Sequence, residues 1–416
     1  MQRLRRALPL TDRSALRPKL VARFLIVKGM PVASRIAAVD FARGLVLVAM
    51  TIDHLPGNLL EHFTPRNFAL SDSAEAFVFL SGLSVGLIYY RRTVAAGLAP
   101  VARSCFKRAG RLYGVHILMT AAALAIFAAA YWLGGSHDAL IAPHGRAVVF
   151  HQPLRGALGV ALLSHQLGYF NILPLYVALM ALAPLVLALA RFSPTVALVA
   201  ALGAYCAVKW FGIDLPNWPE PGGWFFNPLA WQLVFTLGVL AGVRWSDGPP
   251  RRSAIIQAAS VGVTAAGALI VSDGFGFLPG LRDSAYAVLD IGKQDLGAAR
   301  LVNFLALAYL LATTPLLGAL ARTSTGEAVQ SLGRRGLPVF AVGSLLCALG
   351  QAGGSLLAAS VDDRMAQALQ LGYTLAAIGA LFILASWLEC GISLRDGAHA
   401  VGRWLLRRQP ESALAR

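Results

Sequence analysis

The sequence predicts an all-α polytopic membrane protein with about ten transmembrane helices and both termini in the cytoplasm. Of its 416 residues, 57% are hydrophobic and 13% are charged, and the mean hydropathy is +0.64. A soluble domain carries about twice that share of charged residues, roughly 25%. Too few polar residues remain to cover the two or three soluble domains that this length would otherwise form. The four cysteines show no CxxC spacing, so neither a disulfide scaffold nor a metal framework is expected.

Ten segments are apolar enough to cross a membrane, which takes about 20 mostly apolar residues. They are residues 36–56, 74–90, 112–133, 167–190, 195–212, 225–244, 254–272, 299–321, 338–358 and 367–392. A further apolar piece at 154–164 is too short to span and is interpreted as an interfacial or re-entrant helix. The longest outside connections, 134–166 and 273–298, are rich in Gly, Pro, His and aromatic residues, as expected for surfaces that meet a polar ligand. Three histidines of the first connection recur every seven residues, which is not a metal-ligand spacing, so no metal site is expected.

The distribution of basic residues sets the predicted orientation. About three quarters of the 36 Lys and Arg residues fall in alternate connections and at the two chain ends, and cytoplasmic segments carry such an excess. The chain therefore divides into a basic cytoplasmic N-terminal segment (1–35), an integral membrane domain (36–392) and a basic cytoplasmic tail (393–416). The net charge of +16 follows from this topology in a lipid bilayer, so it does not argue for a nucleic-acid partner.

Four ionisable residues lie within the first predicted span: Asp40, Arg43, Asp53 and His54. Arg43 and His54 are eleven residues apart, which in a helix is roughly 16 Å along the axis and only about 20° around it. Asp40 precedes Arg43 by three residues and shares its face. One polar stripe thus begins with an ion pair on the cytoplasmic side and ends with an imidazole near the outer side. A structural ion pair and a solvated histidine form the simpler interpretation, but four ionisable groups within one span favour a function.

The second predicted span begins with an acidic pair. Asp72 and Glu75 fit the N-cap and the third position of a capping box. The functional alternative is that Glu75 faces the same outer cavity as His54. Farther along, Gly82 and Gly86 are four residues apart, which favours close helix packing over phosphate binding.

A basic run precedes the third predicted span, with Arg103, Lys107, Arg108 and Arg111 at helical spacing. An ordinary positive-inside anchor explains these residues. The alternative is a cradle for a polyanionic cytoplasmic ligand, such as the phosphates of coenzyme A, which arginine binds through paired hydrogen bonds.

Further polar residues stand at the ends of later spans. The amides of Asn171, Asn227 and Gln232 would bond a sugar or an acyl group, or equally a neighbouring helix. Lys293 and Arg300 lie at one outer helix entrance, where snorkelling is the simple account of two charges.

Several of these segments resemble a known family. VDFARG, TIDHLPGN and RNFALSDSAEAFVFLSG look like the signature of the osmoregulated periplasmic glucan succinyltransferase family. NILPLY, FNPLAWQL and LGRRGLPVF are similar to its later blocks, and the resemblance covers about residues 35 to 390. LGRRGLPVF departs from the pattern at Arg335-Gly336, where a more polar pair is expected.

That family falls within a wider group of membrane acyltransferases that modify cell-surface sugars. The group shares an arginine, ten residues and then a histidine in its first span, which Arg43 and His54 match here. It also shares an Arg-x-x-Arg after the second span, matched by Arg108 and Arg111, and an FxLSG-like second span, matched at residues 79–82.

The resemblance implies transfer of a succinyl group from cytoplasmic succinyl-coenzyme A to hydroxyls of a periplasmic glucan, in the bacterial inner membrane. In the expected mechanism His54 is the general base for the sugar hydroxyl, and Asp53 or Glu75 orients the imidazole. A transient acyl-imidazole is an open alternative. Arg43, held by Asp40, is expected nearer the donor.

The remaining predicted roles concern binding, with acyl-coenzyme A as co-substrate and no permanently bound cofactor. The residues expected to bind the coenzyme A phosphates are Arg103, Lys107, Arg108 and Arg111. The residues expected to bind the glucan or the acyl group are Asn58, Arg66, Asn171, Asn227, Gln232, Lys293 and Arg300.

Two other functions are compatible with the same residues. A transporter or flippase for an anionic or sugar-linked substrate would also need charged spans and a polar cavity, although transporters often show internal repeats and none is found here. An acetyltransferase acting on another surface polysaccharide would use the same site, because nothing in the sequence determines the acyl chain length. The glucan structure and the oligomeric state are equally open.

Overall fold

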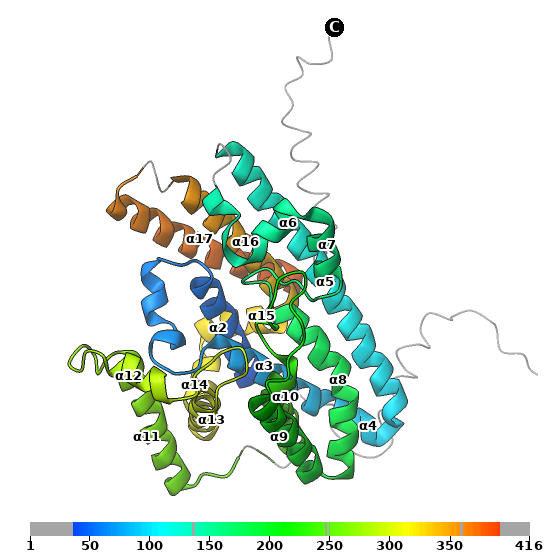
Figure 1. Ribbon diagram of the computed structural model, residues 1–416. Helices are drawn as coiled ribbons and strands as arrows, with labels where there is room; N and C mark the ends of the chain where they lie inside the picture. Colours follow the sequence, from blue (N-terminus) through cyan, green and yellow to red (C-terminus); the bar gives the residue numbers. More distant parts are fainter. Residues whose placement is uncertain (1–35, 135–137, 246–247, 249, 358–360, 392–416) are drawn as a thin grey trace, which may run out of the picture. The chain divides into compact units, whose positions relative to one another are not determined.

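All regular secondary structure of the described residues is helical in the computed structural model (Figure 1). The structure describes residues 36–134, 138–245, 248, 250–357 and 361–391. The predicted basic segments 1–35 and 393–416 lie outside these residues. Within the described part of the chain, seven helices are long and apolar enough to cross a membrane, which makes the chain a multi-pass membrane protein.

Each of the ten predicted spans contains a helix or a pair of helices. In chain order these are α2 (Ala37–Asp53), α3 (Ser73–Val85), α5 (Leu98–Leu133), α8 (Ile172–Phe192), α9 (Pro194–Phe211), α10 (Pro228–Arg244), α11 (Ala254–Val271), α13 (Ala298–Thr313) with α14 (Leu316–Ala321), α16 (Gly336–Leu357) and α17 (Asp363–Glu389). Helix α3 continues through residues 86–90 into α4 (Arg91–Ala96), and Ser73–Ala96 is one 24-residue member of the seven long apolar helices. Helices α2, α10 and α13 have only 17, 17 and 16 residues and are not among the seven. The number ten and the side on which the termini lie therefore stay predictions.

The eighth predicted span, 299–321, is interrupted, which corrects the prediction of one continuous helix. Helix α13 ends at Thr313 and α14 begins at Leu316, with Thr314 extended at ψ 153°. The cause is Pro315, whose ring disfavours a helical conformation of the preceding residue and which has no N–H to continue the hydrogen-bond ladder.

Helix α5 begins well before the predicted third span. It starts at Leu98, directly after Gly97, which has a φ of 84° and separates it from α4 (Arg91–Ala96). Glycine adopts this left-handed region without a steric penalty. The basic run predicted as a connection is therefore the first part of the same 36-residue helix.

Helices α3 and α10 approach each other closely along a glycine-lined face. A Cβ at Gly82 would lie 2.1 Å from the Phe235 carbonyl O, and one at Gly238 would lie 2.2 Å from the Phe79 carbonyl O. No residue with a side chain fits at these positions, so the glycines allow the two helix backbones to contact each other. This confirms the close packing predicted for Gly82 and Gly86. The contacts advance in the same direction along both helices, so α3 and α10 begin at the same end of the bundle.

Helix α15 (Ser324–Arg334) has no counterpart among the predicted spans. It packs on α2 through glycines of both helices: a Cβ at Gly333 would lie 1.9 Å from the Asp40 carbonyl O, and one at Gly44 would lie 2.0 Å from the Val329 carbonyl O. A search for long apolar segments misses α15 because the helix is short and carries apolar residues on one face only.

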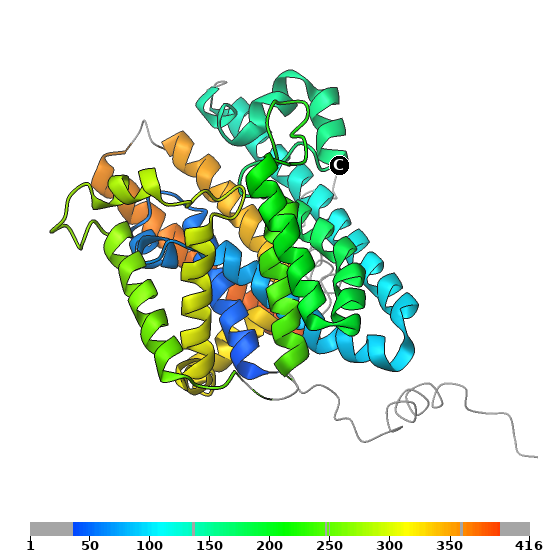
Figure 2. The ribbon, with the colours of Figure 1, turned by 60° about the horizontal axis from the view of Figure 1, so that its bottom comes forward.

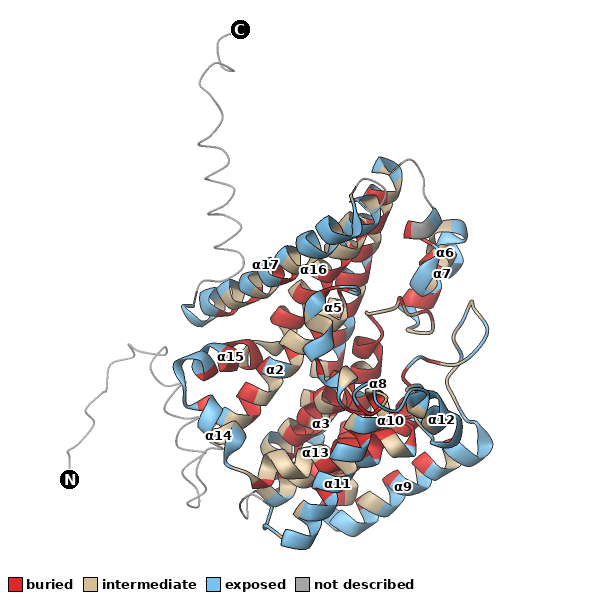
Figure 3. Cartoon of the chain, turned by 90° about the vertical axis from the view of Figure 1, so that its left-hand side faces the viewer, coloured by how far each residue is buried: buried red, intermediate tan, exposed pale blue. Residues whose placement is uncertain are grey.

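Buried side chains concentrate on α3, α8 and α10, whereas α9, α11 and α17 leave most of their side chains exposed (Figure 3). Helices α11 and α13 run side by side at one edge of the bundle (Figure 2). Large apolar residues are exposed on the outer helices, for example Trp210 on α9 and Ile255 on α11. Such residues face a lipid solvent without a hydrophobic penalty.

Short helices fill the long connections. Helices α6 (Arg146–His151) and α7 (Pro153–Ala161) lie between α5 and α8, and α12 (Leu281–Val288) lies between α11 and α13. The apolar piece predicted at 154–164 corresponds to α7, which is too short to cross a membrane. These connections gather at the end of the bundle where α3 and α8 begin.

Candidate active site

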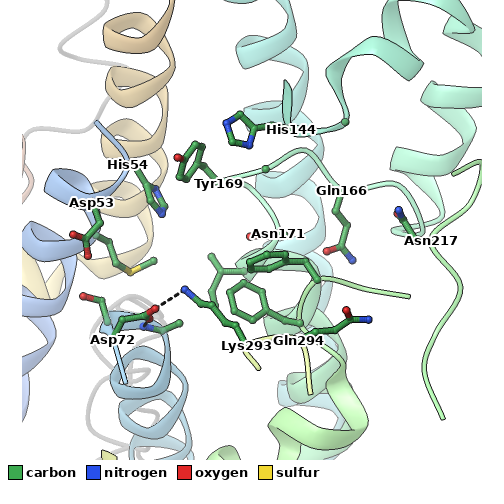
Figure 4. Close-up of a pocket in the computed structure, with 18 of the residues that line it drawn as sticks. Asp53, His54, Asp72, His144, Gln166, Tyr169, Asn171, Asn217, Lys293 and Gln294 are labelled. Carbon is green, nitrogen blue, oxygen red and sulfur yellow. Dashed lines mark hydrogen bonds and ion pairs between the residues drawn. The ribbon is translucent and has the colours of Figure 1, made fainter. Parts of the chain in front are cut away.

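A cavity of about 620 Å³ opens at the bundle end where α2 ends and where α3 and α8 begin (Figure 4). Its wall combines segments far apart in the sequence, from the end of α2 to the loop that precedes α13. The polar and aromatic residues that line it are Asp53, His54, Arg66, Asp72, Ser73, His144, Gln166, Tyr169, Asn171, Asn217, Glu220, Phe225, Phe226, Lys293 and Gln294. Ionisable groups, amides and rings therefore share one wall.

His54 directly follows the last residue of α2 and is half-buried in the cavity wall. Its backbone N–H donates to the Met50 carbonyl O at 3.1 Å, which continues the helical pattern by one residue. The centroid of its ring lies 4.7 Å from that of Tyr169, which in turn lies 4.8 Å from that of His144. Three rings thus line one side of the cavity (Figure 4).

Neither carboxylate predicted to orient His54 is hydrogen-bonded to the imidazole within the described part of the chain. Asp53 accepts a hydrogen bond from the Thr64 hydroxyl at 2.6 Å. Glu75 is fully buried and accepts from the Arg300 Nε at 2.7 Å. The orientation of the ring by either carboxylate therefore stays a prediction.

A cluster of four ionisable groups, Asp72, Glu75, Lys293 and Arg300, lies at the start of α3. Asp72 Oδ2 is 2.6 Å from the Lys293 Nζ and 3.1 Å from an Arg300 guanidinium nitrogen. The predicted capping box is confirmed, because Asp72 accepts from the Ala74 N–H at 2.8 Å and Glu75 accepts from the Asp72 N–H at 2.8 Å. Lys293 and Arg300 thus face carboxylates instead of reaching outward, and the start of α3 is tied to the loop before α13.

Within this cluster Asp72 is the carboxylate that faces both cations. Burial raises the pKa of Asp72, but the Lys293 ammonium and the Arg300 guanidinium beside it hold that pKa well below its usual range. Asp72 therefore stays an anion that keeps both cations in place. Arg66 is exposed at the cavity wall and has no ion-pair partner among the described residues, so it is the less compensated cation.

The side of the cavity away from His54 carries amides (Figure 4). Gln166, Asn217 and Gln294 all line it, and the Phe226 ring centroid lies 5.6 Å from the Lys293 Nζ. Amides both donate and accept hydrogen bonds, as sugar hydroxyls do. This wall is suited to a neutral ligand with many hydroxyl groups.

Four predicted binding residues do not line the cavity: Arg300, which is paired with Asp72 and Glu75, and three amides that hold the fold. Asn58 is 1% exposed, and its Nδ2 donates to the carbonyl O of Ile52 in the last turn of α2 and to that of Leu55 just after it. Asn227 caps α10 by accepting from the Leu229 N–H at 3.0 Å, and the Gln232 Nε2 donates to the Ala201 carbonyl O of α9 at 2.8 Å. The predicted binding residues that do line the cavity are Arg66, Asn171 and Lys293.

Arg43 and Asp40 lie toward the opposite end of α2 and do not line the cavity. The Arg43 Nη1 donates to the Asp40 carboxylate at 2.9 Å, which confirms the predicted ion pair. The Arg43 Nη2 donates to the Ser84 hydroxyl of α3 at 2.5 Å. The polar stripe on α2 therefore has one end bound to neighbouring side chains and one end in the cavity.

The basic run at the start of α5 divides between two faces. Arg103, Lys107 and Arg111 are spaced by four residues and are exposed. Arg108 turns toward α8, where its Nη2 donates to the Tyr176 hydroxyl at 2.8 Å. A binding role for these residues stays a prediction, and the three exposed ones form the row that a phosphate would reach first.

Several cavity residues were not singled out from the sequence. Tyr169, Gln166, Asn217 and Gln294 all lie on connections, whose path through space a periodicity does not reveal. The only signal was general: the outer connections are rich in aromatic and polar residues, and Tyr169 stands two residues before the predicted Asn171.

These features define the class of the protein: a helical membrane protein with a titratable polar cavity at one end of its bundle. A family model described as OpgC protein matches residues 35–391. The chain belongs to this OpgC family of membrane acyltransferases, which confirms the resemblance seen in the sequence. No protein with a curated description and no solved structure matches the chain.

Proposed function

We propose that this membrane acyltransferase transfers a succinyl group from succinyl-coenzyme A to hydroxyl groups of a periplasmic glucan, with His54 as general base. The observation that carries the proposal is the position of His54 at the end of α2, with its ring in the cavity wall. The cavity falls in the roughly 300–1,000 Å³ range of small-molecule sites, with a volume of about 620 Å³.

The reaction is a direct acyl transfer. The neutral imidazole of His54 takes the proton of a sugar hydroxyl while the hydroxyl oxygen attacks the thioester carbonyl carbon. The tetrahedral intermediate collapses with cleavage of the C–S bond, and the imidazolium returns the proton to the departing thiolate. The products are a succinyl ester of the sugar and free coenzyme A.

Two cations at the cavity wall support this chemistry. Arg66 and Lys293 line the cavity, and α3 and α8 begin there, so their N-terminal dipole ends face it. Fixed positive groups stabilise the oxyanion of a tetrahedral intermediate, and they equally suit the free carboxylate of a succinyl group. An acetyl group has no free carboxylate, so the cations would not favour its binding in this way.

The acceptor wall and the donor side are assigned to different regions. The amides of Gln166, Asn217 and Gln294 bind glucan hydroxyls. Arg43 lies about 16 Å farther along α2, which is the direction from which a donor on the other side of the membrane would enter. The exposed basic row of α5 binds the coenzyme A phosphates.

The proposed orientation in the bacterial inner membrane follows from the basic residues. A reporter that is active only in the periplasm should be active when fused near His62 or Asp283. It should be silent when fused near Arg103 or at the C-terminus. Activity at the C-terminus would place the cavity on the wrong side for a periplasmic acceptor.

The function itself is tested with membranes that contain the wild-type chain or a His54→Ala variant at matched protein levels. Incubation with labelled succinyl-coenzyme A and purified glucan should label the glucan only in the wild type. A parallel incubation with labelled acetyl-coenzyme A tests the acetyltransferase alternative. Absence of label from either donor, together with movement of glucan across vesicle membranes, would establish a flippase in place of the transferase.

A further inference from the structure

Gln351 of α16 joins a buried arginine to the backbone of His54. The Gln351 Nε2 donates to the His54 carbonyl O at 2.8 Å, and the Gln351 Oε1 accepts from the Arg146 Nη2 at 2.8 Å. The Arg146 Nη1 donates to the Leu140 carbonyl O, also at 2.8 Å. The end of α2, the last third of α16 and the start of α6 are thereby connected, although they are far apart in the sequence.

The chemistry of the pair fixes which way the amide points. Arginine has only donors, so the oxygen of Gln351 must face Arg146 and its NH₂ group must face the His54 carbonyl. Carbonyls in the last turn of a helix have no partner within the helix. Gln351 therefore supplies a donor that α2 cannot supply to its own end.

Arg146 is a buried cation whose side-chain partner is the neutral amide of Gln351. It is only 5% exposed, and among the described residues it has no carboxylate partner. Its guanidinium carbon lies 3.6 Å from the centroid of the Phe127 ring, and burial lowers its pKa to about 10. A buried cation is costly unless its hydrogen bonds are made in good geometry. The position of this guanidinium is thus fixed, and it holds the Gln351 amide in turn.

We propose that Gln351, held by Arg146, is a positioning residue for His54. The amide fixes the carbonyl at the end of α2, and thereby the ring that follows from the same Cα, while both ring nitrogens stay available to substrate. The proposal rests on the proposed role of His54 as general base. Neither Gln351 nor Arg146 lines the cavity, so they act on the rate of the chemical step and not on substrate binding.

The chain offers a matched pair of variants at residue 351. Gln351→Ala removes both hydrogen bonds. Gln351→Glu keeps an acceptor for Arg146, which also keeps the new carboxyl ionised, but it removes the donor to His54. A matched control is Gln370→Ala on α17, because the Gln370 Nε2 donates to the Pro56 carbonyl O, two residues beyond His54.

The measurement is kcat and KM for donor and acceptor with purified protein, alongside thermal unfolding. A misplacement of about 1 Å costs about 10²-fold in rate, so both Gln351 variants should lose about 10- to 100-fold in kcat while KM stays within about threefold. Gln370→Ala should keep kcat within about twofold, since it leaves the His54 carbonyl bonded.

Two results would overturn the proposal. One is a wild-type kcat in a folded Gln351→Glu protein, because it would show that the hydrogen bond to the His54 carbonyl does not affect the rate. This test remains valid where Gln351→Ala fails to fold. The other is an equal loss of kcat in Gln370→Ala, which would assign the effect to the loop after α2 as a whole. A His54→Ala protein assayed in parallel distinguishes failure of the positioning role from failure of the general-base role. If His54→Ala is inactive while Gln351→Glu is fully active, only the positioning role of Gln351 is refuted. If His54→Ala is active, both the general-base role and the positioning role are refuted.

Discussion

The two ends of α2 carry similar residues in opposite surroundings. At one end Arg43 is bonded to Asp40 and to Ser84, and α15 covers the helix through glycine contacts. At the other end His54 stands in the wall of an open cavity with its ring against Tyr169. The same helix thus presents charges that are bonded within the bundle and a titratable ring that is accessible.

The two ends show how an ionisable group that is bonded within the bundle differs from one that can exchange a proton with substrate. Ionisable groups within a membrane need partners or a water-filled cavity. Asp40 and Arg43 are partners of each other. His54 has a cavity in place of a charged partner, and that is the condition under which an imidazole exchanges a proton with substrate.

The largest effect is expected at the open end. His54→Gln should lower transfer by about 10²–10⁴-fold, because an amide forms hydrogen bonds but cannot accept the proton at neutral pH. Cells that carry this variant should make glucan that lacks the succinyl charge. Anion-exchange profiling of periplasmic glucan, with immunoblotting for protein level, measures the loss.

The control for this variant is His62→Gln, which changes an exposed histidine eight residues farther along and outside the cavity lining. Its glucan should bind the anion exchanger as the wild-type glucan does. Normally charged glucan from His54→Gln cells would show that His54 is not the catalytic base. A reduced amount of periplasmic glucan that carries its normal charge would indicate a flippase.

Much of this comparison was predictable from the sequence, because it depends on one helix. The spacing of Arg43 and His54 places them on one face of α2, and the Asp40–Arg43 pair follows from a separation of three residues. The capping box of Asp72 and Glu75 is likewise a local pattern.

The surroundings of the two ends were not predictable, because they depend on contacts between distant segments. Nothing in the sequence near Asp72 indicates Lys293, which is 221 residues away and 2.6 Å from its carboxylate. Similarly, the glycine that lets α15 approach Asp40 stands in a polar segment without a span pattern. Hydropathy finds helices, but it does not find what covers their ends.

The next largest effect is expected at the bonded end. Arg43→Gln should raise KM for acyl-coenzyme A about tenfold or more, since a hydrogen bond to a charged group contributes about 1.5–3 kcal/mol. KM for the glucan should stay unchanged because Arg43 does not line the cavity. Initial rates at varied donor concentration measure the change.

A second variant distinguishes donor binding from a structural ion pair at this end. Asp40→Asn combined with Arg43→Gln removes both charges, so no buried carboxylate is left without its partner. If the pair only stabilises the bundle, the double variant should recover both thermal stability and donor KM relative to Arg43→Gln. If Arg43 binds the donor, stability should recover and the raised KM should persist.

The smallest effect is expected on α5, which extends the comparison to the exposed face of another helix. Arg111 is exposed in the row with Arg103 and Lys107, whereas Arg108 is bonded to Tyr176. An exposed ion pair contributes about 0.2–1 kcal/mol, so Arg111→Gln should raise donor KM by at most about fivefold.

Salt decides whether this small effect is electrostatic. Exposed charges are screened over about 10 Å at 0.1 M salt and over about 3 Å at 1 M, so the difference between wild type and Arg111→Gln should shrink as salt rises. Arg108→Gln should instead lower the unfolding temperature, because it leaves the Tyr176 hydroxyl without its donor, and any change in its donor KM should depend less on salt. A membrane-inserted Arg111→Gln protein with unchanged donor KM at low salt would assign the exposed row to anchoring at the membrane surface. The phosphates would then have to be bound through Arg108 or Arg43, and the donor would enter between α3, α5 and α8 and not along the outer face of α5.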